Sequence, residues 1–419
     1  MRAKVLVLGG GVMGAAIAWQ LALRLDPHDE PVVLLEKRAL AAGSSGRSGA
    51  ILRQQYSERV LAAMARDSLR VYTNLERATG RYIGFVRTGV LTIAGPRQTD
   101  EQELLRRNVA MQRELGIAVE LCDAAGMRRI APGLAIAEGA LGAWEPEAGA
   151  VDPVRSVEAF AALARENGAA TRLGVRVESI ALRAGRVHGV ETSEGFVETE
   201  TVVLAAGPWS RALLLPLGID LPLRAVRPEQ YFKEMLEGAH SGDGSRGEHE
   251  LEARLAWGKP VLPVAGHPVL LDLENNVYTR CQPHEGRTRV GRMDYAEDEE
   301  ISDPDALDET VRPSFVAWAR ERLEERIPGY RAKADAGTLA GIYTLTPDAQ
   351  ALIGRLGPVE GLWVATGFSG HGFKLAPSVG EGVAQMICGE PVSAFDAQFF
   401  DPRRFDGGRR ASAGRGFGL

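Results

Sequence analysis

The chain has 419 residues, of which 45% are hydrophobic and 25% charged, as is usual for a globular protein with room for two or three domains. The formal net charge of -6 argues against a nucleic-acid partner, and no segment approaches the roughly 20 apolar residues of a transmembrane helix. The cysteines, Cys122, Cys281 and Cys388, lack metal-binding or disulfide spacing, so we expect inert thiols and a cytoplasmic protein.

A β-α-β unit is predicted at the N-terminus. Residues 4–8 and 32–35 are short apolar runs typical of buried parallel strands, and a helix is expected over residues 12–24 between them. The first turn reads Gly9-Gly10-Gly11-Val12-Met13-Gly14, and Glu36 follows 22 residues after Gly14. Glycines let the backbone approach a pyrophosphate at the helix N-terminus, and the acidic residue can accept hydrogen bonds from a ribose. The pattern predicts a Rossmann-type dinucleotide site but does not decide between FAD and NAD.

The later elements follow from hydrophobic periodicity and from turn signals. Helices are expected over residues 58–79, 100–115, 152–167 and 309–326, and from the loop 367–372 to Ile387. Strands are expected at 202–204 and 362–365, and antiparallel strands over 256–295. The polar segment 237–254 is predicted to be a surface excursion, and residues 406–419 a disordered tail.

Three segments could extend the dinucleotide site to the length of FAD. Hydroxyls and backbone N–H groups of Ser44 to Ser48 suit a phosphate or a ribose. The small residues Ala205-Ala206-Gly207 end a buried strand. Gly367-Phe368-Ser369-Gly370-His371-Gly372 is a second glycine-rich loop before a helix, whose N-terminus would favour negative charge on a reduced flavin.

Taken together, these motifs resemble the D-amino acid oxidase superfamily of FAD enzymes, and within it the branch of sarcosine oxidase and N-methyl amino acid oxidases. The resemblance runs from residue 4 to about residue 405, and its most specific motif is the last loop with Phe373 and Lys374. The other matching segments are Gly9–Gly14 with Glu36, Ser44–Tyr56, Arg176-Val177-Glu178, Ala205–Trp209 and Ile342–Asp348.

The resemblance implies an α/β protein in which a Rossmann-type FAD-binding domain is interleaved with an antiparallel-sheet substrate domain. We expect the FAD-binding domain at 1–80, 150–220 and 330–405, and the substrate domain at 81–149 and 221–329. The residues expected at FAD are Gly9, Gly11, Val12, Met13, Gly14, Glu36, Lys37, Ser44, Ser45, Gly46, Arg47, Ser48, Val177, Ala206, Gly207, Trp209, Gly341, Gly367, Phe368, Ser369, Gly370, His371, Gly372, Phe373 and Lys374.

The resemblance also implies the residues that meet the substrate. Arg53 and Lys374 occupy the positions that hold the substrate carboxylate in sarcosine oxidases, and two cations from distant segments can clamp a carboxylate. Tyr278 and Tyr343 match aromatic positions of that active site, where rings can contact an amine. The alternatives are a surface ion pair for Arg53, solvation at the start of the helix for Lys374, and an ordinary place in the core for the two tyrosines.

Two departures from the family pattern bear on its chemistry. Gly341 stands where sarcosine oxidases have the cysteine that is linked to FAD, so we expect non-covalent FAD. Arg289 stands where the oxidases have a lysine that promotes reaction with oxygen, and Met293 where they have a histidine. A dehydrogenase that passes electrons to a protein or a quinone therefore becomes as plausible as an oxidase. The alternative is that Arg289 is a strand residue that pairs with the acidic run 297–300.

The leading hypothesis is the oxidation of an amino acid or N-methyl amino acid, related to sarcosine, glycine or proline, to an imine by hydride transfer to the flavin N5. One alternative is a 2-hydroxy acid dehydrogenase of the same superfamily. The other is a flavoprotein that serves as an electron-transfer subunit or as an assembly factor, because residues 53–56 also resemble such a protein.

Overall fold

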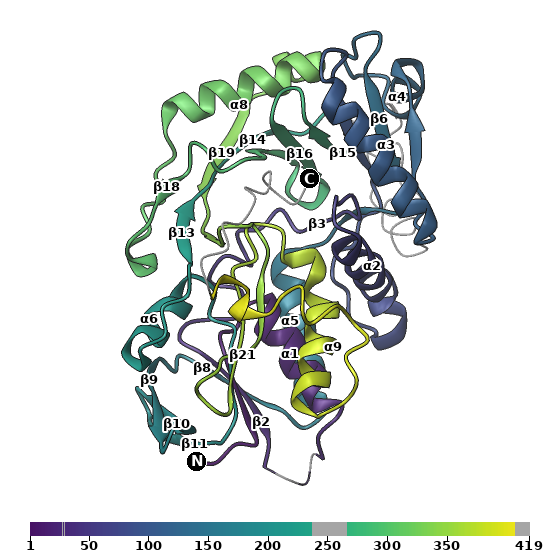
Figure 1. The fold of residues 1–419 in the computed structure, drawn as a ribbon. Coiled ribbons are helices and arrows are strands. Elements are labelled where there is room, and N and C mark those ends of the chain that lie inside the picture. Colours follow the sequence, from purple (N-terminus) through teal and green to yellow (C-terminus); the bar gives the residue numbers. More distant parts are fainter. Residues whose placement is uncertain (27, 29, 237–265, 407–419) are drawn as a thin grey trace.

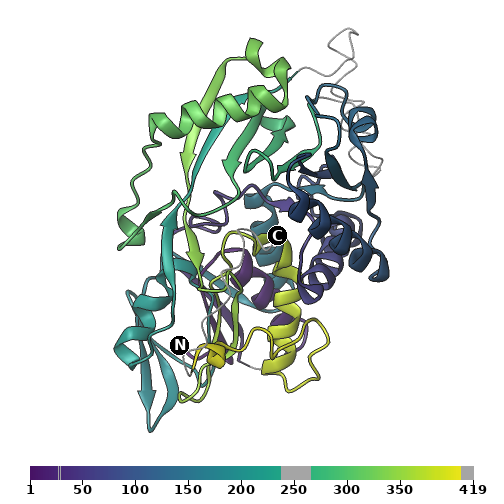
Figure 2. The same cartoon turned by 45° about the horizontal axis from the view of Figure 1, so that its top comes forward.

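The fold is built around two large sheets that lie one above the other in Figure 1, and Figure 2 shows the same division from a second direction. The computed structural model describes residues 1–26, 28, 30–236 and 266–406. The predicted surface excursion at 237–254, the start of the predicted strand region at 256–265 and the tail beyond residue 406 lie outside these residues.

The lower sheet has six strands, in the order β21-β22-β12-β1-β2-β8. All neighbours are parallel except β21 and β22, and Leu6 of β1 is paired with both Val33 and Val202. The bounds are β1 Val5–Leu8, β2 Val32–Glu36, β8 Ala170–Leu173, β12 Val202–Leu204, β21 Leu352–Arg355 and β22 Leu362–Thr366. The β-α-β unit predicted at the N-terminus is therefore present.

Both faces of this sheet are covered, as a parallel sheet requires. Val5 and Val7 belong to the core formed with α1 (Val12–Ala22), α5 (Pro153–Glu166) and α9 (Ala376–Ile387). Leu6 and Leu8 point the other way, into the core under the three-stranded sheet of β9 (Val177–Arg183), β10 (Arg186–Thr192) and β11 (Gly195–Glu198). Because successive side chains of β1 point to opposite faces, the parallel sheet forms the middle of three layers, between the helices and the three-stranded sheet.

The upper sheet has eight strands, in the order β19-β14-β17-β16-β15-β4-β6-β5. Its strands are antiparallel, except that β15 runs parallel to β4. The bounds are β4 Val90–Ala94, β5 Glu120–Cys122, β6 Leu141–Glu145, β14 Glu229–Glu234, β15 Val269–Asp272, β16 Val277–Gln282, β17 Arg287–Arg292 and β19 Asp335–Ala340.

One face of this sheet is covered by α8 (Pro313–Arg326), which crosses the top of Figure 1. The other face carries Val90, Leu271 and Tyr278 and looks toward the lower sheet. The helix expected from residue 309 begins only at Pro313. Glu309 pairs with Arg47, and the N–H of Arg312 donates to Glu229 Oε1 over 2.6 Å, so these contacts hold the preceding residues outside the helix.

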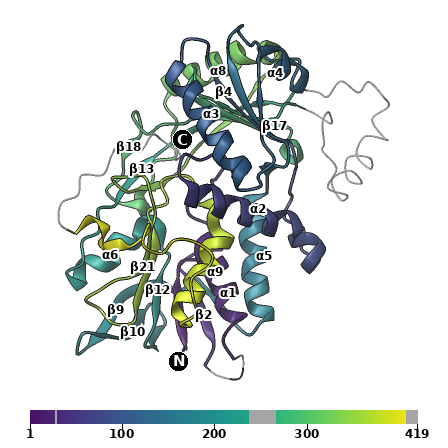
Figure 3. The ribbon, with the colours of Figure 1, turned by 45° about the vertical axis from the view of Figure 1, so that its right-hand side comes forward.

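The helix α2 (Arg59–Thr79) connects the two halves, and Figure 3 shows it between α3 (Thr99–Glu114) and α9. Tyr72 of α2 donates from its hydroxyl to the carbonyl of Phe373 over 2.7 Å, and its Ser68 bonds to Ser378 of α9. The remaining elements are small: α4 Ala124–Ile130, α6 Ser210–Leu214, β3 Ile51–Leu52, β7 Gly149–Ala150, β13 Arg224–Arg227, β18 Glu299–Glu300 and β20 Tyr343–Leu345.

This architecture confirms the predicted fold class, a parallel α/β unit combined with a mainly antiparallel sheet. The proposed residue boundaries of the two domains stay a prediction. Among the helices of the described residues, none combines the length and the apolar character needed to cross a membrane.

Candidate active site

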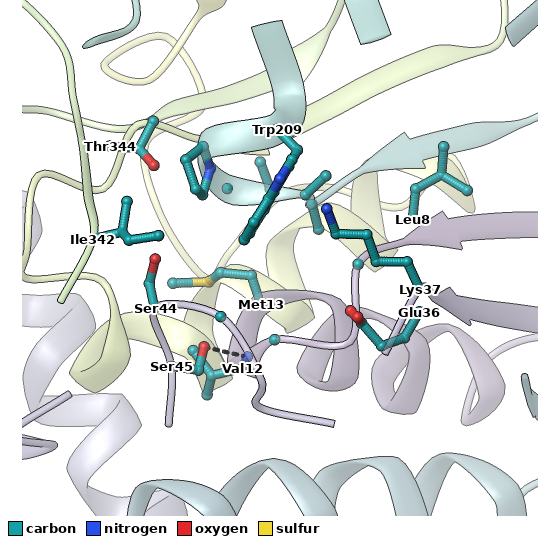
Figure 4. A pocket seen from close by; sticks show the side chains of 18 of the residues that line it. Leu8, Val12, Met13, Glu36, Lys37, Ser44, Ser45, Trp209, Ile342 and Thr344 are labelled. Carbon is teal, nitrogen blue, oxygen red and sulfur yellow. Dashed lines mark hydrogen bonds between the residues drawn. The ribbon is translucent and has the colours of Figure 1, made fainter. Parts of the chain in front are cut away.

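A cavity of about 470 Å³ opens at the carboxyl ends of the parallel strands β1, β2 and β12. Its walls come from eight separate segments of the chain: residues 8–13, 35–38, 43–48, 175–178, 205–213, 305, 342–344 and 365–373. Figure 4 shows Glu36 and Lys37 at one end and Ser44, Ile342 and Thr344 at the other. A cavity at the carboxyl edge of a parallel sheet is where α/β folds bind dinucleotides.

The glycine-rich turn brings the N-terminus of α1 to this cavity. Gly14 packs directly over Gly9, because a Cβ on Gly14 would lie 1.9 Å from the Gly9 carbonyl oxygen. Ser45 Oγ accepts a hydrogen bond from the N–H of Val12 over 3.0 Å (Figure 4). Glu36 is held by the N–H groups of Gly10 (2.7 Å) and Arg38 (2.8 Å). The positive end of a helix dipole and a fixed carboxylate thus border one cavity.

The lining of the cavity fits FAD. The hydroxyl of Ser44 is buried and has no hydrogen-bond partner among the described residues, so it is available to a phosphate or a ribose. Gly11 leaves its side of the cavity open, since an added Cβ would approach only Ser45 Oγ, at 3.0 Å. The dinucleotide would be held by Gly9–Met13, Glu36 and Ser44–Ser45. The last lining segment in the sequence is Gly367–Phe373, which forms another part of the cavity wall.

A cluster of charges around Trp209 closes one end of the cavity. Lys37 Nζ lies 4.1 Å from the centre of the Trp209 ring and 2.5 Å from Asp305 Oδ1, and Arg38 also pairs with Asp305. Asp305 lies in the segment that leads from β18 to α8 and lines the cavity. Sequence reasoning missed Asp305 because it stands 268 residues from Lys37 and lies in no motif.

The loop after β22 is fixed by bonds to residues of several segments. Ser369 N–H donates to the carbonyl of Thr344 over 2.9 Å. His371 Nε2 lies 2.8 Å from the carbonyl of Ala349, which can only accept, so Nε2 carries the proton and Nδ1 can accept. Burial first, and then the nearby Lys374, lower the pKa of His371 to about 3, so this ring is neutral.

Arg53 and Lys374 are both buried, with exposed fractions of 3% and 7%, and both lie beside the ring of Tyr56. The guanidinium carbon of Arg53 is 4.4 Å from the ring centre and Lys374 Nζ is 5.9 Å from it. Neither residue lines the cavity itself, but Lys374 directly follows Phe373, which does. Tyr56, whose ring lies near both cations, was matched to the family but not predicted as a site residue.

Of the other predicted substrate residues, Tyr278 and Arg289 lie on strands of the upper sheet, and Tyr343 lies on β20 of a separate three-stranded sheet. Tyr343 lines the cavity, whereas Tyr278 is buried on β16 and joins the same small core as Tyr343 and Met293. Arg289 donates to the carbonyl of Arg47 over 2.8 Å and to the side chain of Gln230. The acidic run 297–300 pairs with Arg224 and Arg227 instead, so the predicted alternative partner of Arg289 is wrong.

Most of the residues expected at FAD line the cavity, and six do not. Gly14 and Gly46 are packing positions, since a Cβ on either would meet a backbone carbonyl. Arg47 is occupied by Glu309 and the carbonyl of Ala340. Gly341, His371 and Lys374 are next in sequence to lining residues but do not line the cavity themselves. Six further lining residues lie in segments that were matched to the family but were not predicted individually: Arg176, Glu178, Ala205, Pro208, Ile342 and Thr344. The lining residues that the sequence did not indicate are Leu8, Leu35, Arg38, Gly43, Val175, Ala212, Leu213, Asp305 and Ala365.

The fold and the cavity together define a dinucleotide-dependent enzyme, and comparison with known proteins identifies its family. The family model described as FAD dependent oxidoreductase (DAO) matches residues 4–386. The chain therefore belongs to this family, which confirms the resemblance and FAD as the cofactor.

Several characterised proteins are similar to the chain. It is 28% identical to 4-methylaminobutanoate oxidase (formaldehyde-forming) of Paenarthrobacter nicotinovorans over 96% of its length, but spans only 46% of that relative. It is 27% identical to the monomeric sarcosine oxidase of Bacillus sp. (strain B-0618), with 91% of each chain covered. The solved structure of L-proline dehydrogenase from P. horikoshii superposes with a TM-score of 0.81, at 27% identity and with 97% and 98% of the two chains covered.

The substitution Gly11→Val should abolish FAD binding while the chain still folds. The branched side chain would fill the part of the cavity that the pyrophosphate needs, and within 4 Å its Cβ would approach only Ser45 Oγ in the protein. Flavin absorbance of the purified variant and its melting temperature measure the two effects. Gly133→Val is the matched control, because a Cβ there meets nothing within 4 Å. Full flavin content in a folded Gly11→Val protein would refute this placement.

FAD should be released intact when the protein is denatured by acid or heat. Gly341 offers no side chain for a covalent link, and no cysteine or histidine is among the described residues that line the cavity. After precipitation, the flavin absorbance should be in the supernatant and the denatured chain should have the mass of the bare polypeptide. Flavin that stays with the precipitate would show that a covalent link exists.

Proposed function

We propose that this chain oxidises the α-carbon–nitrogen bond of an amino acid or an N-methyl amino acid, and that the resulting imine is hydrolysed by water. The observation that carries the proposal is the pair of buried side chains Arg53 and Lys374, which both lie near the ring of Tyr56, with Lys374 directly after Phe373 of the cavity wall. Two positive charges that are buried near the same ring repel each other, and a substrate carboxylate would reduce this repulsion.

The relatives support the same class of substrate. The oxidases of sarcosine and 4-methylaminobutanoate and the dehydrogenase of L-proline all act, by name, on amino acids with a secondary amine. The carboxylate of such a substrate would bind Arg53 and Lys374, and its amine would point toward the aromatic side of the cavity at Tyr343.

When bound, FAD supplies the acceptor for a hydride, so no side chain has to perform the redox step. Arg53 and Lys374 would fix the substrate by its carboxylate and orient its C–H bond. Their positive charge would also disfavour a protonated amine nearby. A neutral amine has a free electron pair that assists hydride departure from the adjacent carbon, so binding and activation of the substrate depend on the same two cations.

We also propose that electrons pass from this protein to an acceptor protein or a quinone. Arg289 replaces the lysine expected in an oxidase, and its guanidinium is engaged with Arg47 and Gln230. A planar, diffuse guanidinium does not substitute for the compact ammonium of a lysine. The cytoplasmic location stays a prediction from the sequence.

Anaerobic addition of N-methyl amino acids or cyclic amino acids should bleach the yellow flavin, and 2-hydroxy acids should not. Flavin absorbance under argon measures this reduction.

Arg53→Ala and Lys374→Ala should each lower kcat/KM, because each leaves the substrate carboxylate without one cation. The loss corresponds to about 2–5 kcal/mol of transition-state stabilisation. Steady-state kinetics with an artificial electron acceptor measure the loss of kcat/KM in the two variants.

Three outcomes would contradict this function. Reduction by hydroxy acids alone would make the chain a 2-hydroxy acid dehydrogenase. Reduction by none of these compounds would favour the electron-transfer or assembly role. Unchanged kinetics in both variants would exclude the clamp.

Oxygen should reoxidise the reduced flavin slowly, over many seconds, and Arg289→Lys should accelerate this step. A lysine at position 289 restores a compact ammonium near Arg47, which belongs to the Ser-rich wall of the cavity at residues 43–48. The measurement is rapid mixing of the reduced protein with aerated buffer. Arg287→Lys is the control, because Arg287 lies on the same strand face but pairs with Glu285. Reoxidation of the unmodified protein within milliseconds would make it an oxidase.

A further inference from the structure

One part of the cavity wall comes from the segment between β18 and α8, residues 301–312, which is here called the strap. Asp305 of the strap lines the cavity, and its Oδ1 lies 2.5 Å from Lys37 Nζ. Four residues further along, Glu309 pairs with Arg47. The strap is therefore joined to the segment after β2 and to the Ser-rich wall, both of which border the cavity.

The two ends of the strap are fixed to strands that do not border the cofactor cavity. The N–H of Ile301 donates to the carbonyl of Ala225 on β13 over 2.8 Å, and the N–H of Arg312 donates to Glu229 Oε1 on β14 over 2.6 Å. Between these anchors, residues 302–309 form no backbone hydrogen bond with another segment of the described chain, and none of their side chains belongs to its hydrophobic cores. The middle of the strap is therefore attached to the opposite wall of the cavity through charged side chains.

These attachments are of a kind that separates easily. The side chains of Asp305 and Glu309 have exposed fractions of 52% and 62%, and those of Lys37 and Arg47 are each 22% exposed. Ion pairs between partly exposed side chains contribute little stability, and dissolved salt screens them. The glycine-rich turn and the loop after β22 are held by backbone contacts instead. The strap is thus a wall that can move away without breaking a backbone hydrogen bond to the rest of the cavity.

The strap borders the end of the cavity where the adenosine part of FAD would bind. Glu36, whose carboxylate suits a ribose, ends β2 and lines the cavity. Lys37 follows it, and its Nζ lies 4.1 Å from the centre of the Trp209 ring (Figure 4). Asp305 accepts hydrogen bonds from the same ammonium through both carboxylate oxygens. The strap, Lys37 and Trp209 therefore close this end of the cavity together.

We propose that the strap is a gate for the cofactor, and that Asp305 and Glu309 determine how fast bound FAD is released. In the closed form, the ion pairs of both residues are formed and the strap covers the adenosine end of the cavity. Breaking these pairs frees the middle of the strap, while its anchors on β13 and β14 keep it attached to the protein. The proposal concerns the cofactor alone and does not depend on which substrate is oxidised.

The test measures the exchange of bound FAD in the FAD-loaded protein. Isotope-labelled FAD is added in excess, the protein is separated by rapid desalting, and mass spectrometry of its flavin gives the labelled fraction over time. Asp305→Asn should accelerate the exchange about fivefold, because the strap loses its attraction to Lys37 and Arg38. The double variant Asp305→Asn/Glu309→Gln should exchange about twentyfold faster than the parent. Asp305→Glu, which keeps the charge, should exchange less than about twofold faster.

Glu300→Gln is the matched control. Glu300 of β18 has a similarly exposed carboxylate that pairs with Arg224 of β13, but it does not line the cavity, so its loss should leave the exchange rate unchanged. Salt provides a second comparison. Raising NaCl from about 0.05 M to about 1 M should accelerate exchange about tenfold in the parent, but less than about threefold in the double variant, which has no ion pair of Asp305 or Glu309 left to screen.

Glu309→Gln separates a gate from a direct contact with FAD. Neither Glu309 nor Arg47 lines the cavity, so the loss of this pair can act only through the strap, and it should accelerate exchange about threefold. Unchanged exchange in Glu309→Gln would overturn the proposal, as would equal salt dependence in the parent and in the double variant. A Glu300→Gln protein that exchanges FAD as fast as Asp305→Asn would also overturn it, because any loss of surface charge would then loosen the cofactor.

Discussion

The close contact between Gly9 and Gly14 sets the geometry on which the cofactor site depends. Because no side chain separates the two residues, α1 starts directly at the end of β1, with its N-terminal N–H groups at the edge of the parallel sheet. The same turn lets Gly10 donate to Glu36 at the end of β2. The positive helix end and the carboxylate are thus placed together by backbone packing before any ligand binds.

Around this edge, the protein buries several charged side chains. Arg53 and Lys374 lie in the interior near Tyr56, and Glu145 is a buried carboxylate that accepts the N–H groups of Gln54 and Gln55. Nearby, Arg280 and Arg289 face each other on adjacent strands and are bonded mainly to backbone carbonyls and amide side chains. Such a positive interior suits an anionic substrate and a cofactor that gains negative charge on reduction.

The two large sheets cooperate because segments of one reach the ligand site of the other. Asp305, which follows β18, pairs with Lys37 and Arg38 at the end of β2, and Glu309 pairs with Arg47 of the Ser-rich wall. Helix α2 is bonded to the segment that contains Lys374: its Tyr72 donates to the carbonyl of Phe373, and its Ser68 bonds to Ser378 of α9. Segments that accompany both large sheets therefore meet at the cofactor cavity, and its walls depend on contacts between them.

The sequence by itself determined the elements whose signal is local. Hydrophobic runs and glycine spacing gave the β-α-β unit, the helices near 59–79 and 153–166, and the wall segments 9–13, 44–48 and 367–373. Only the tertiary structure decided that Asp305 joins the cavity, that Glu145 supports Arg53, and that the helix predicted from residue 309 begins at Pro313. These features depend on contacts between residues about 80 to 270 positions apart, and no local pattern of side chains encodes such contacts.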